Sequence, residues 1–201
     1  MTGTLAVIAK APVPGRVKTR LCPPCTPAQA AALAEAALRD TLAAVATTPA
    51  VRRAVVLDGD PGPWLPAGFD VVPQRGDGLD ERLTCAFEDL GAPTVIVGMD
   101  TPQLTPRLLA RALAALERAD AVLGPALDGG YWAIGLRRPD ARALRGVPMS
   151  APDTGARQRG RLRELGLAVA ELPTLRDVDA IEDARAVAAI APWTRFAALA
   201  A

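Results

Sequence analysis

Short apolar runs of strand length alternate with longer stretches of helical pattern along this 201-residue chain. The runs are rich in valine, isoleucine and leucine, as are strands that are buried on both faces of a parallel sheet. Regular alternation of this kind predicts an α/β fold, with a mostly parallel sheet and helices on both faces. We expect strands at residues 5–8, 54–57, 69–72, 94–97, 121–123, 131–136 and 167–170, and helices at 26–45, 79–90, from 105 to about 116, 154–165 and 181–190.

The composition supports one domain over residues 1–201, since domains commonly have about 50–250 residues. Half of the residues are hydrophobic but only 3% are aromatic, so the core is expected to consist of alanine, leucine, valine and isoleucine. The net charge of +1 argues against a nucleic-acid or membrane surface. The chain shows no signal-peptide pattern and no run near the ~18 apolar residues of a membrane helix, so we expect a cytoplasmic protein.

Histidine is absent from the chain. This excludes nucleophilic Ser–His and Cys–His pairs and any histidine-ligated metal. Proton transfer or metal binding must then fall to carboxylates, lysine, water or substrate, and carboxylate sites suit Mg²⁺ or Mn²⁺ better than zinc. A Cys-x-x-Cys pair is present at Cys22 and Cys25, but Cys85 is the one cysteine left to complete a zinc site, so metal or redox use is disfavoured.

A basic loop, residues 9–21 (Ala-Lys-Ala-Pro-Val-Pro-Gly-Arg-Val-Lys-Thr-Arg-Leu), follows the first predicted strand. It carries Lys10, Arg16, Lys18 and Arg20, and no carboxylate neutralises them. An open α/β sheet binds ligands at the carboxyl ends of its strands. Two prolines stiffen the loop, so that less entropy is lost when a ligand binds. The loop is therefore a candidate phosphate site; the alternative is a solvated basic loop.

Asp100 follows the predicted strand 94–97, at the same edge of the sheet. A carboxylate there is well placed for a divalent cation, and Gly98 would let another group approach closely. The alternative is that Asp100 belongs to a turn or caps the helix that follows Thr101.

Asp177 and Asp179 flank a valine, so in an extended segment both face the same side. They are candidates for a second metal ligand. Alternatively they cap the helix that begins near Ala180, a use that suits Asp179 better than Asp177.

Two glycine-containing loops are further candidates. Residues 124–130 hold Asp128, which could orient an acceptor hydroxyl or act as a base, beside the paired Gly129 and Gly130. A plain hairpin turn is the alternative for this loop. Residues 75–82 open a helix whose amide groups could bind an anion or a base edge, or they form a solvated turn.

Four segments in this order resemble the DUF2064 family, also called the radical-SAM/selenodomain-associated transferase 1 family. They are Lys-Ala-Pro-Val-Pro-Gly-Arg-Val-Lys-Thr-Arg-Leu at 10–21, Gly-Met-Asp-Thr-Pro-Gln-Leu at 98–104, Gly-Pro-Ala-Leu-Asp-Gly-Gly-Tyr at 124–131 and Arg-Asp-Val-Asp at 176–179. That family is similar to nucleotide-diphospho-sugar transferases of the GT-A fold, a three-layer α/β/α sandwich. The Lys-Thr-Arg-Leu element also resembles the phospholactate guanylyltransferase family.

The resemblance implies roles for the residues already singled out. Asp100 would hold the divalent metal, Mg²⁺ or Mn²⁺, with Asp177 or Asp179 as a further contact. From the residues themselves we also expect Arg16, Lys18 and Asp128 to take part in catalysis. The residues that would bind the nucleotide or border the acceptor pocket are Ala9, Lys10, Gly15, Arg16, Lys18, Arg20, Gly76, Gly98, Gly129 and Gly130.

The main functional hypothesis is a metal-dependent glycosyltransferase that moves a sugar from a nucleotide sugar to a small acceptor. The alternative is a nucleotidyltransferase that couples a nucleoside triphosphate to a phosphorylated small molecule and releases pyrophosphate. A phosphate nucleophile is already ionised and needs no general base, which fits a chain without histidine. A third hypothesis is a nucleotide-binding protein without catalytic activity.

Overall fold

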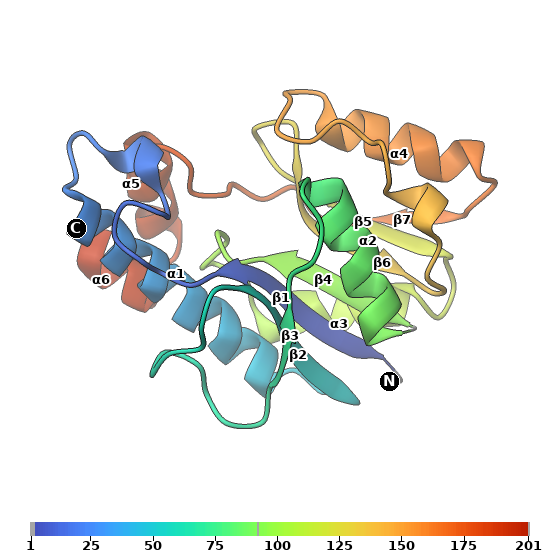
Figure 1. Cartoon of the computed structure of the whole chain (residues 1–201), viewed down its shortest axis with the longest axis horizontal. Coiled ribbons are helices and arrows are strands. Elements are labelled where there is room, and N and C mark those ends of the chain that lie inside the picture. Colours follow the sequence, from blue (N-terminus) through green and yellow to red (C-terminus); the bar gives the residue numbers. More distant parts are fainter. Residues whose placement is uncertain (1–2, 92, 201) are drawn as a thin grey trace.

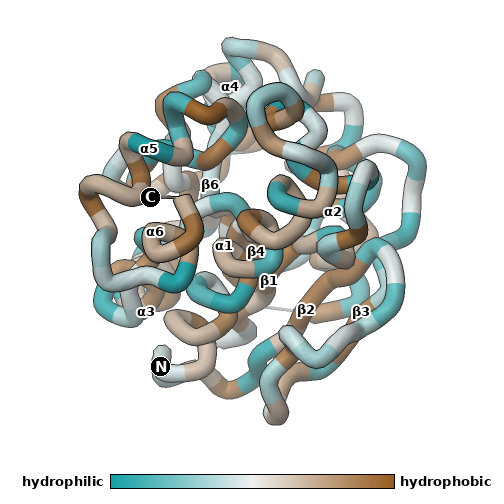
Figure 2. Tube along the Cα trace, turned by 90° about the vertical axis from the view of Figure 1, so that its left-hand side faces the viewer, coloured by the Kyte–Doolittle hydropathy of each residue, from teal (hydrophilic) through white to brown (hydrophobic). Residues whose placement is uncertain are grey.

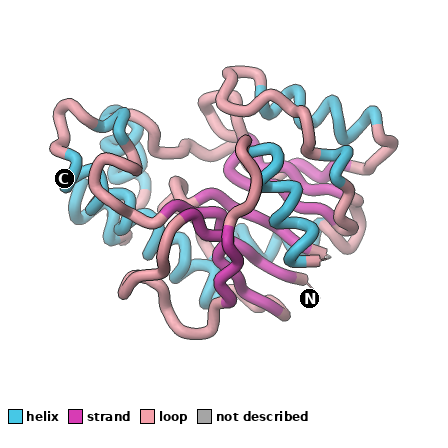
Figure 3. Tube along the Cα trace, in the orientation of Figure 1, coloured by secondary structure: helices cyan, strands magenta, loops and turns pink. Residues whose placement is uncertain are grey.

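A computed structural model describes residues 3–91 and 93–200 of the chain. Its strands form one seven-stranded sheet in the order β3-β2-β1-β4-β6-β5-β7. Strand β6 is antiparallel to β4 and β5, and the other neighbouring strands are parallel, which confirms the mostly parallel sheet. The strands are β1 (Thr4–Lys10), β2 (Arg52–Asp58), β3 (Asp70–Pro73), β4 (Thr94–Gly98), β5 (Ala121–Pro125), β6 (Tyr131–Leu136) and β7 (Val169–Glu171). The α-helices are α1 (Pro27–Thr47), α2 (Leu79–Leu90), α3 (Pro106–Ala115), α4 (Thr154–Glu164), α5 (Ile181–Ile190) and α6 (Arg195–Ala200), with short 3-10 turns at Thr19–Leu21 and Ala141–Ala143 (Figures 1 and 3).

Helices cover both faces of the sheet, as the alternation predicts (Figure 1). Side chains of a strand point alternately to its two faces. In β1, Leu5 and Val7 pack with α1 and α3, whereas Ala6 packs with α2 and α4 on the other side. Figure 2 shows hydrophobic brown segments along the central trace and much teal or white at the periphery. Both cores consist mainly of aliphatic side chains, as the low aromatic content predicts.

Helix α1 begins at the capping box that the sequence indicates, in which Thr26 and Gln29 bond each other's backbone N–H groups. A third hydrophobic cluster packs α5 and α6 against α1. Helix α6 is absent from the sequence prediction, since six residues are too few to show a helical period. The buried carboxylate of Asp40 in α1 accepts from the backbone N–H groups of Arg195 and Phe196, at 3.2 and 2.8 Å, and so fixes the start of α6.

The parallel pairing places the carboxyl ends of β1 and β4 side by side, with Ile8 opposite Gly98. The basic loop and Asp100 therefore leave the sheet at neighbouring points. After β7 the chain crosses this edge as an extended segment and continues into α5 (Figure 1). The N–H of Val178 in that segment donates to the carbonyl of Asp100 at 3.0 Å. Among residues 3–91 and 93–200, the structure contains no helix with both the length and the apolar character needed to cross a membrane.

Candidate active site

A cleft of about 620 Å³ opens at the carboxyl edge of the sheet. Strands β1 and β4, the basic loop, the start of α2 and the segment after β7 all contribute to its walls. Most of the residues singled out from the sequence lie here. Those in the lining are Ala9, Lys10, Arg16, Lys18, Arg20, Gly98, Asp100, Asp177 and Asp179. Gly15, Gly76, Asp128, Gly129 and Gly130 are described by the structure but are not in the lining.

Lys18 is the least exposed of the four cations in the basic loop. Its Nζ lies 2.8 Å from Asp100 Oδ2 and 3.2 Å from Asp179 Oδ1, and it also donates to the carbonyl of Val178. We call these three oxygens the oxygen cage. The Lys18 side chain is only 9% exposed, and the residue has a left-handed backbone with φ 48°. The sequence indicates a phosphate contact for Lys18, whereas in the structure its ammonium lies against Asp100 and Asp179.

Arg16 and Arg20, two other cations of the basic loop, are more exposed than Lys18. Arg20 pairs with Asp179 Oδ2 at 2.8 Å, but its side chain is 72% exposed. Arg16 lines the cleft and makes no ion pair within residues 3–91 and 93–200. Both guanidinium groups are therefore available to an anionic ligand in the cleft.

Asp100 lies in the turn after β4, and only one of its two carboxylate oxygens has a partner among the described residues. Its Oδ2 pairs with Lys18, whereas its Oδ1 is buried without a hydrogen-bond partner among the described residues. A buried acceptor without a partner is costly and points to a missing donor or cation. An all-oxygen donor set of carboxylates and a carbonyl is what Mg²⁺ and Mn²⁺ prefer. The residues present therefore fit a divalent metal.

Asp183, rather than Asp179, caps helix α5. Its Oδ2 accepts from the backbone N–H groups of Asp179 and Ala180, at 3.3 and 2.9 Å, and its Oδ1 pairs with Arg176 at 2.8 Å. The pKa of Asp183 is lowered, because these donors outweigh the effect of burial. The capping alternative for Asp179 is therefore wrong, and its carboxylate is left to face the cleft.

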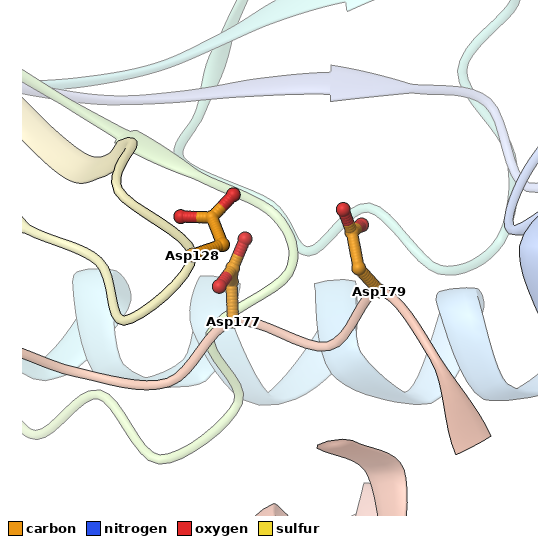
Figure 4. A group of neighbouring side chains, drawn as sticks. All are labelled: Asp128, Asp177 and Asp179. Carbon is orange, nitrogen blue, oxygen red and sulfur yellow. The ribbon is translucent and has the colours of Figure 1, made fainter. Parts of the chain in front are cut away.

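The loop between β5 and β6 is a hairpin connection, as the alternative interpretation has it. It nevertheless brings Asp128 close to the other acids. One oxygen each from Asp128, Asp177 and Asp179 lie within 4.8 Å of one another, and Figure 4 shows the three carboxylates rising to the same side. Asp128 also accepts from the N–H of Gly130 at 2.8 Å.

The paired glycines of this hairpin have a packing role. Gly129 has φ +89°, and a Cβ there would lie 1.8 Å from the carbonyl oxygen of Pro152. The carbonyl of Gly129 accepts from the N–H of Gly155 in α4 at 2.8 Å. Backbone therefore packs directly on backbone at this point, which the sequence alone does not reveal.

Asp177 is half-buried, and burial together with the nearby Asp128 carboxylate raises its pKa from 3.8 to about 6. The folded state thus binds this proton more tightly than the unfolded chain does. Stability from this group is present below about pH 4 and is lost as the pH rises to about 6.

We expect Asp177→Asn to raise the urea midpoint at pH 8 and to leave it almost unchanged at pH 4. Urea titrations of the variant and the wild type at the two pH values test this. A midpoint at pH 8 that is equal to or lower than that of the wild type would contradict it.

The far end of the cleft lies at the β2–β3 side of the sheet. Gln74 follows β3, and its Nε2 donates to the carbonyls of Ala9 and Val56 at 2.8 and 3.0 Å. Asp77 and Arg82 lie nearby in the segment that opens α2, and both line the cleft. The sequence offers residues 75–82 as a possible base site but gives no sign of Gln74. A lone glutamine after an edge strand carries no recognisable motif.

Comparisons with known proteins support this description. Residues 30–151 match the family described as "Uncharacterized protein conserved in bacteria (DUF2064)". A phosphoenolpyruvate guanylyltransferase from Thermomonospora curvata is 37% identical, over 92% of this chain and 84% of that protein. Another from Conexibacter woesei is 34% identical, over 76% of this chain and 73% of that protein.

Solved structures agree. A proposed nucleotide-diphospho-sugar transferase from Desulfovibrio desulfuricans G20 has a TM-score of 0.89 and 28% identity, and the match covers 98% of this chain and 93% of that one. More remote neighbours share the fold. They include CMP:2-keto-3-deoxy-manno-octonic acid synthetase complexed with CTP (TM-score 0.61, 13% identity, 96% and 99% of the two chains). Rv0371c of Mycobacterium tuberculosis H37Rv complexed with manganese is another (TM-score 0.57, 21% identity, 92% and 96% of the two chains). The chain thus belongs to the DUF2064 family and is a transferase with the α/β fold of the nucleotide-diphospho-sugar transferases.

Proposed function

We propose that this protein is a nucleotidyltransferase that transfers a guanylyl group from GTP to a small phosphorylated acid such as phosphoenolpyruvate. The observation that carries the proposal is the 37% identity to a phosphoenolpyruvate guanylyltransferase over 92% of the chain. Of the hypotheses drawn from the sequence, this is the alternative rather than the main one.

The chemistry of the cleft supports the proposal. An acceptor phosphate oxygen would attack the α-phosphorus of GTP, the bond from that phosphorus to the bridging oxygen would break, and pyrophosphate would leave. The nucleophile is already ionised, so the reaction needs no general base, and the chain has no histidine to supply one. Arg16, Lys18 and Arg20 would stabilise the charge on the departing phosphates.

The acids are the proposed metal ligands. Asp100, with Asp177 and Asp179, would hold Mg²⁺ or Mn²⁺, which when bound neutralises phosphate charge and orients the triphosphate. A neighbour of the same fold is described as a complex with manganese, which is consistent with such a site. The role of Asp128 is then to add negative charge beside Asp177 rather than to activate a hydroxyl.

Glycosyl transfer remains the second candidate, because a structure with a TM-score of 0.89 is that of a proposed nucleotide-diphospho-sugar transferase. One experiment separates the two. The protein is incubated with Mg²⁺, GTP and phosphoenolpyruvate, and in parallel with a panel of nucleotide sugars and small hydroxyl acceptors. We expect acceptor-dependent pyrophosphate release from GTP. Release of nucleoside diphosphate from a nucleotide sugar, without pyrophosphate from GTP, would overturn the proposal.

Asp77 is the residue that we expect to select guanine. It lines the cleft and follows β3, which β2 and β1 separate from β4 in the sheet, and its N–H donates to Glu81 Oε2 at 3.1 Å. The N1–H and 2-amino groups of guanine are adjacent donors, and a carboxylate can accept from both. Inosine lacks the 2-amino group, so the wild-type protein should prefer GTP over ITP.

Asp77→Asn should lower kcat/KM for GTP by about tenfold to a hundredfold and that for ITP much less, because an amide offers one acceptor where two donors must be met. The ratio of the two values is measured by pyrophosphate release. Asp60→Asn is the matched control, since Asp60 is exposed and outside the cleft lining. An unchanged GTP/ITP ratio in Asp77→Asn would rule out this role.

A further inference from the structure

We propose that in the nucleotide-free protein Lys18 occupies the position of the catalytic metal, so that the metal binds tightly only when a polyphosphate draws Lys18 away. The proposal deepens the proposed function, because it concerns the same cleft and the same acids. It makes Lys18 a switch between two partners rather than a fixed phosphate contact.

The oxygen cage carries this inference. The Lys18 ammonium has three oxygen neighbours, which come from the turn after β4 and from the segment before α5: Asp100 Oδ2, Asp179 Oδ1 and the carbonyl of Val178. Carboxylate and carbonyl oxygens that converge from separate segments are the ligands of a hard divalent cation. Here one ammonium holds both segments together.

Lys18 is charged in this position. A lysine ammonium is positively charged at neutral pH, and two carboxylate oxygens lie at 2.8 and 3.2 Å from its Nζ. A divalent cation that enters the cage must therefore displace a buried positive charge. Two cations within a few ångströms of each other repel strongly at a site where the lysine side chain is only 9% exposed. The ammonium and the metal thus exclude each other.

A bound triphosphate would remove the competition between Lys18 and the metal for the oxygen cage. Its oxygens offer Lys18 new charge-assisted partners in the same cleft, which Arg16 and Arg20 already line. Once Lys18 has turned to the phosphates, Asp100 and Asp179 are free to bind the metal that accompanies the nucleotide. The free protein is thereby kept from binding metal without its substrate.

The test measures Mn²⁺ binding with no nucleotide present, by the electron paramagnetic resonance signal of free Mn²⁺. Wild-type protein and Lys18→Arg, which keeps the charge, should bind Mn²⁺ weakly. Lys18→Met removes the charge and keeps much of the length, and should bind Mn²⁺ at least about tenfold more tightly. Arg16→Met is the matched control, because Arg16 lines the cleft but makes no ion pair with the described acids, and its affinity should change less than about twofold.

Two further measurements keep the result interpretable. Circular dichroism establishes that Lys18→Met is folded at the temperature of the titration, and Mn²⁺ should raise its melting temperature more than that of the wild type. Adding Asp100→Asn to Lys18→Met should abolish the gain in Mn²⁺ affinity. Equal or weaker Mn²⁺ binding by Lys18→Met, or a gain that survives Asp100→Asn, would overturn the proposal. Because no nucleotide is used, this outcome is independent of whether GTP proves to be the substrate.

Discussion

Asp100→Asn should lower kcat/KM for the proposed nucleotidyl transfer by at least about a hundredfold, and this is the largest catalytic effect that we expect. Asp100 lies two residues after β4, its carbonyl accepts from the N–H of Val178 at 3.0 Å, and its Oδ1 is buried without a partner among the described residues. An amide keeps the shape but loses the charge that would bind the proposed metal. The measurement is the initial rate of pyrophosphate release as a function of GTP concentration, at saturating Mg²⁺ and acceptor, from which kcat/KM is obtained.

Asp100→Asn also takes a partner from Lys18, so its fold must be checked by thermal melting. Asp60→Asn again serves as the control, with activity near that of the wild type. If Asp100→Asn remains folded and keeps more than about a tenth of the wild-type kcat/KM, Asp100 does not hold a metal that the reaction requires.

Gly129→Ala lowers the free energy of unfolding by about 3 kcal/mol or more, the largest effect on stability. The new Cβ would lie 1.8 Å from the Pro152 carbonyl oxygen, and the backbone φ of +89° is one that alanine rarely adopts. Both the hairpin and the start of α4 must shift to relieve the contact. Urea denaturation, with midpoint and slope compared to those of the wild type, measures the loss.

Gly160→Ala is the matched control within α4. A Cβ at Gly160 meets nothing within 4 Å, and the residue lies inside the helix, so alanine should raise stability by about 0.5–1 kcal/mol. We therefore expect the two glycine substitutions to change the free energy of unfolding in opposite directions. A loss smaller than about 1 kcal/mol for Gly129→Ala would show that the hairpin does not depend on this close packing.

The sequence predicts the seven strands and five of the six α-helices of the described chain because each carries its own local signal. Strand β4 is a continuous apolar run, and the Thr26–Gln29 capping box marks the N-terminus of α1. Their bounds shift by a few residues at most, as in β7, where hydrogen bonding to β5 decides the limits. Helix α6 depends on Asp40, which is distant in the sequence, and no local pattern reveals that contact.

For the site, the sequence places the acids and cations at one edge of the sheet but does not give their partners. It offers Asp179 as a helix cap, and the structure gives that role to Asp183, four residues later. It separates Asp128 from the metal candidates, and the hairpin brings it beside Asp177. Which side chains meet across segments depends on packing, and a single sequence does not record it.

We propose that the basic loop and the acids after β4 and β7 bind one metal–triphosphate complex. Anomalous diffraction from crystals grown with Mn²⁺ and a non-hydrolysable GTP analogue tests it directly. We expect a manganese peak within coordination distance of Asp100 and of Asp177 or Asp179, with Lys18 Nζ in contact with the phosphates. A triphosphate bound away from the basic loop, or manganese remote from Asp100, would contradict it.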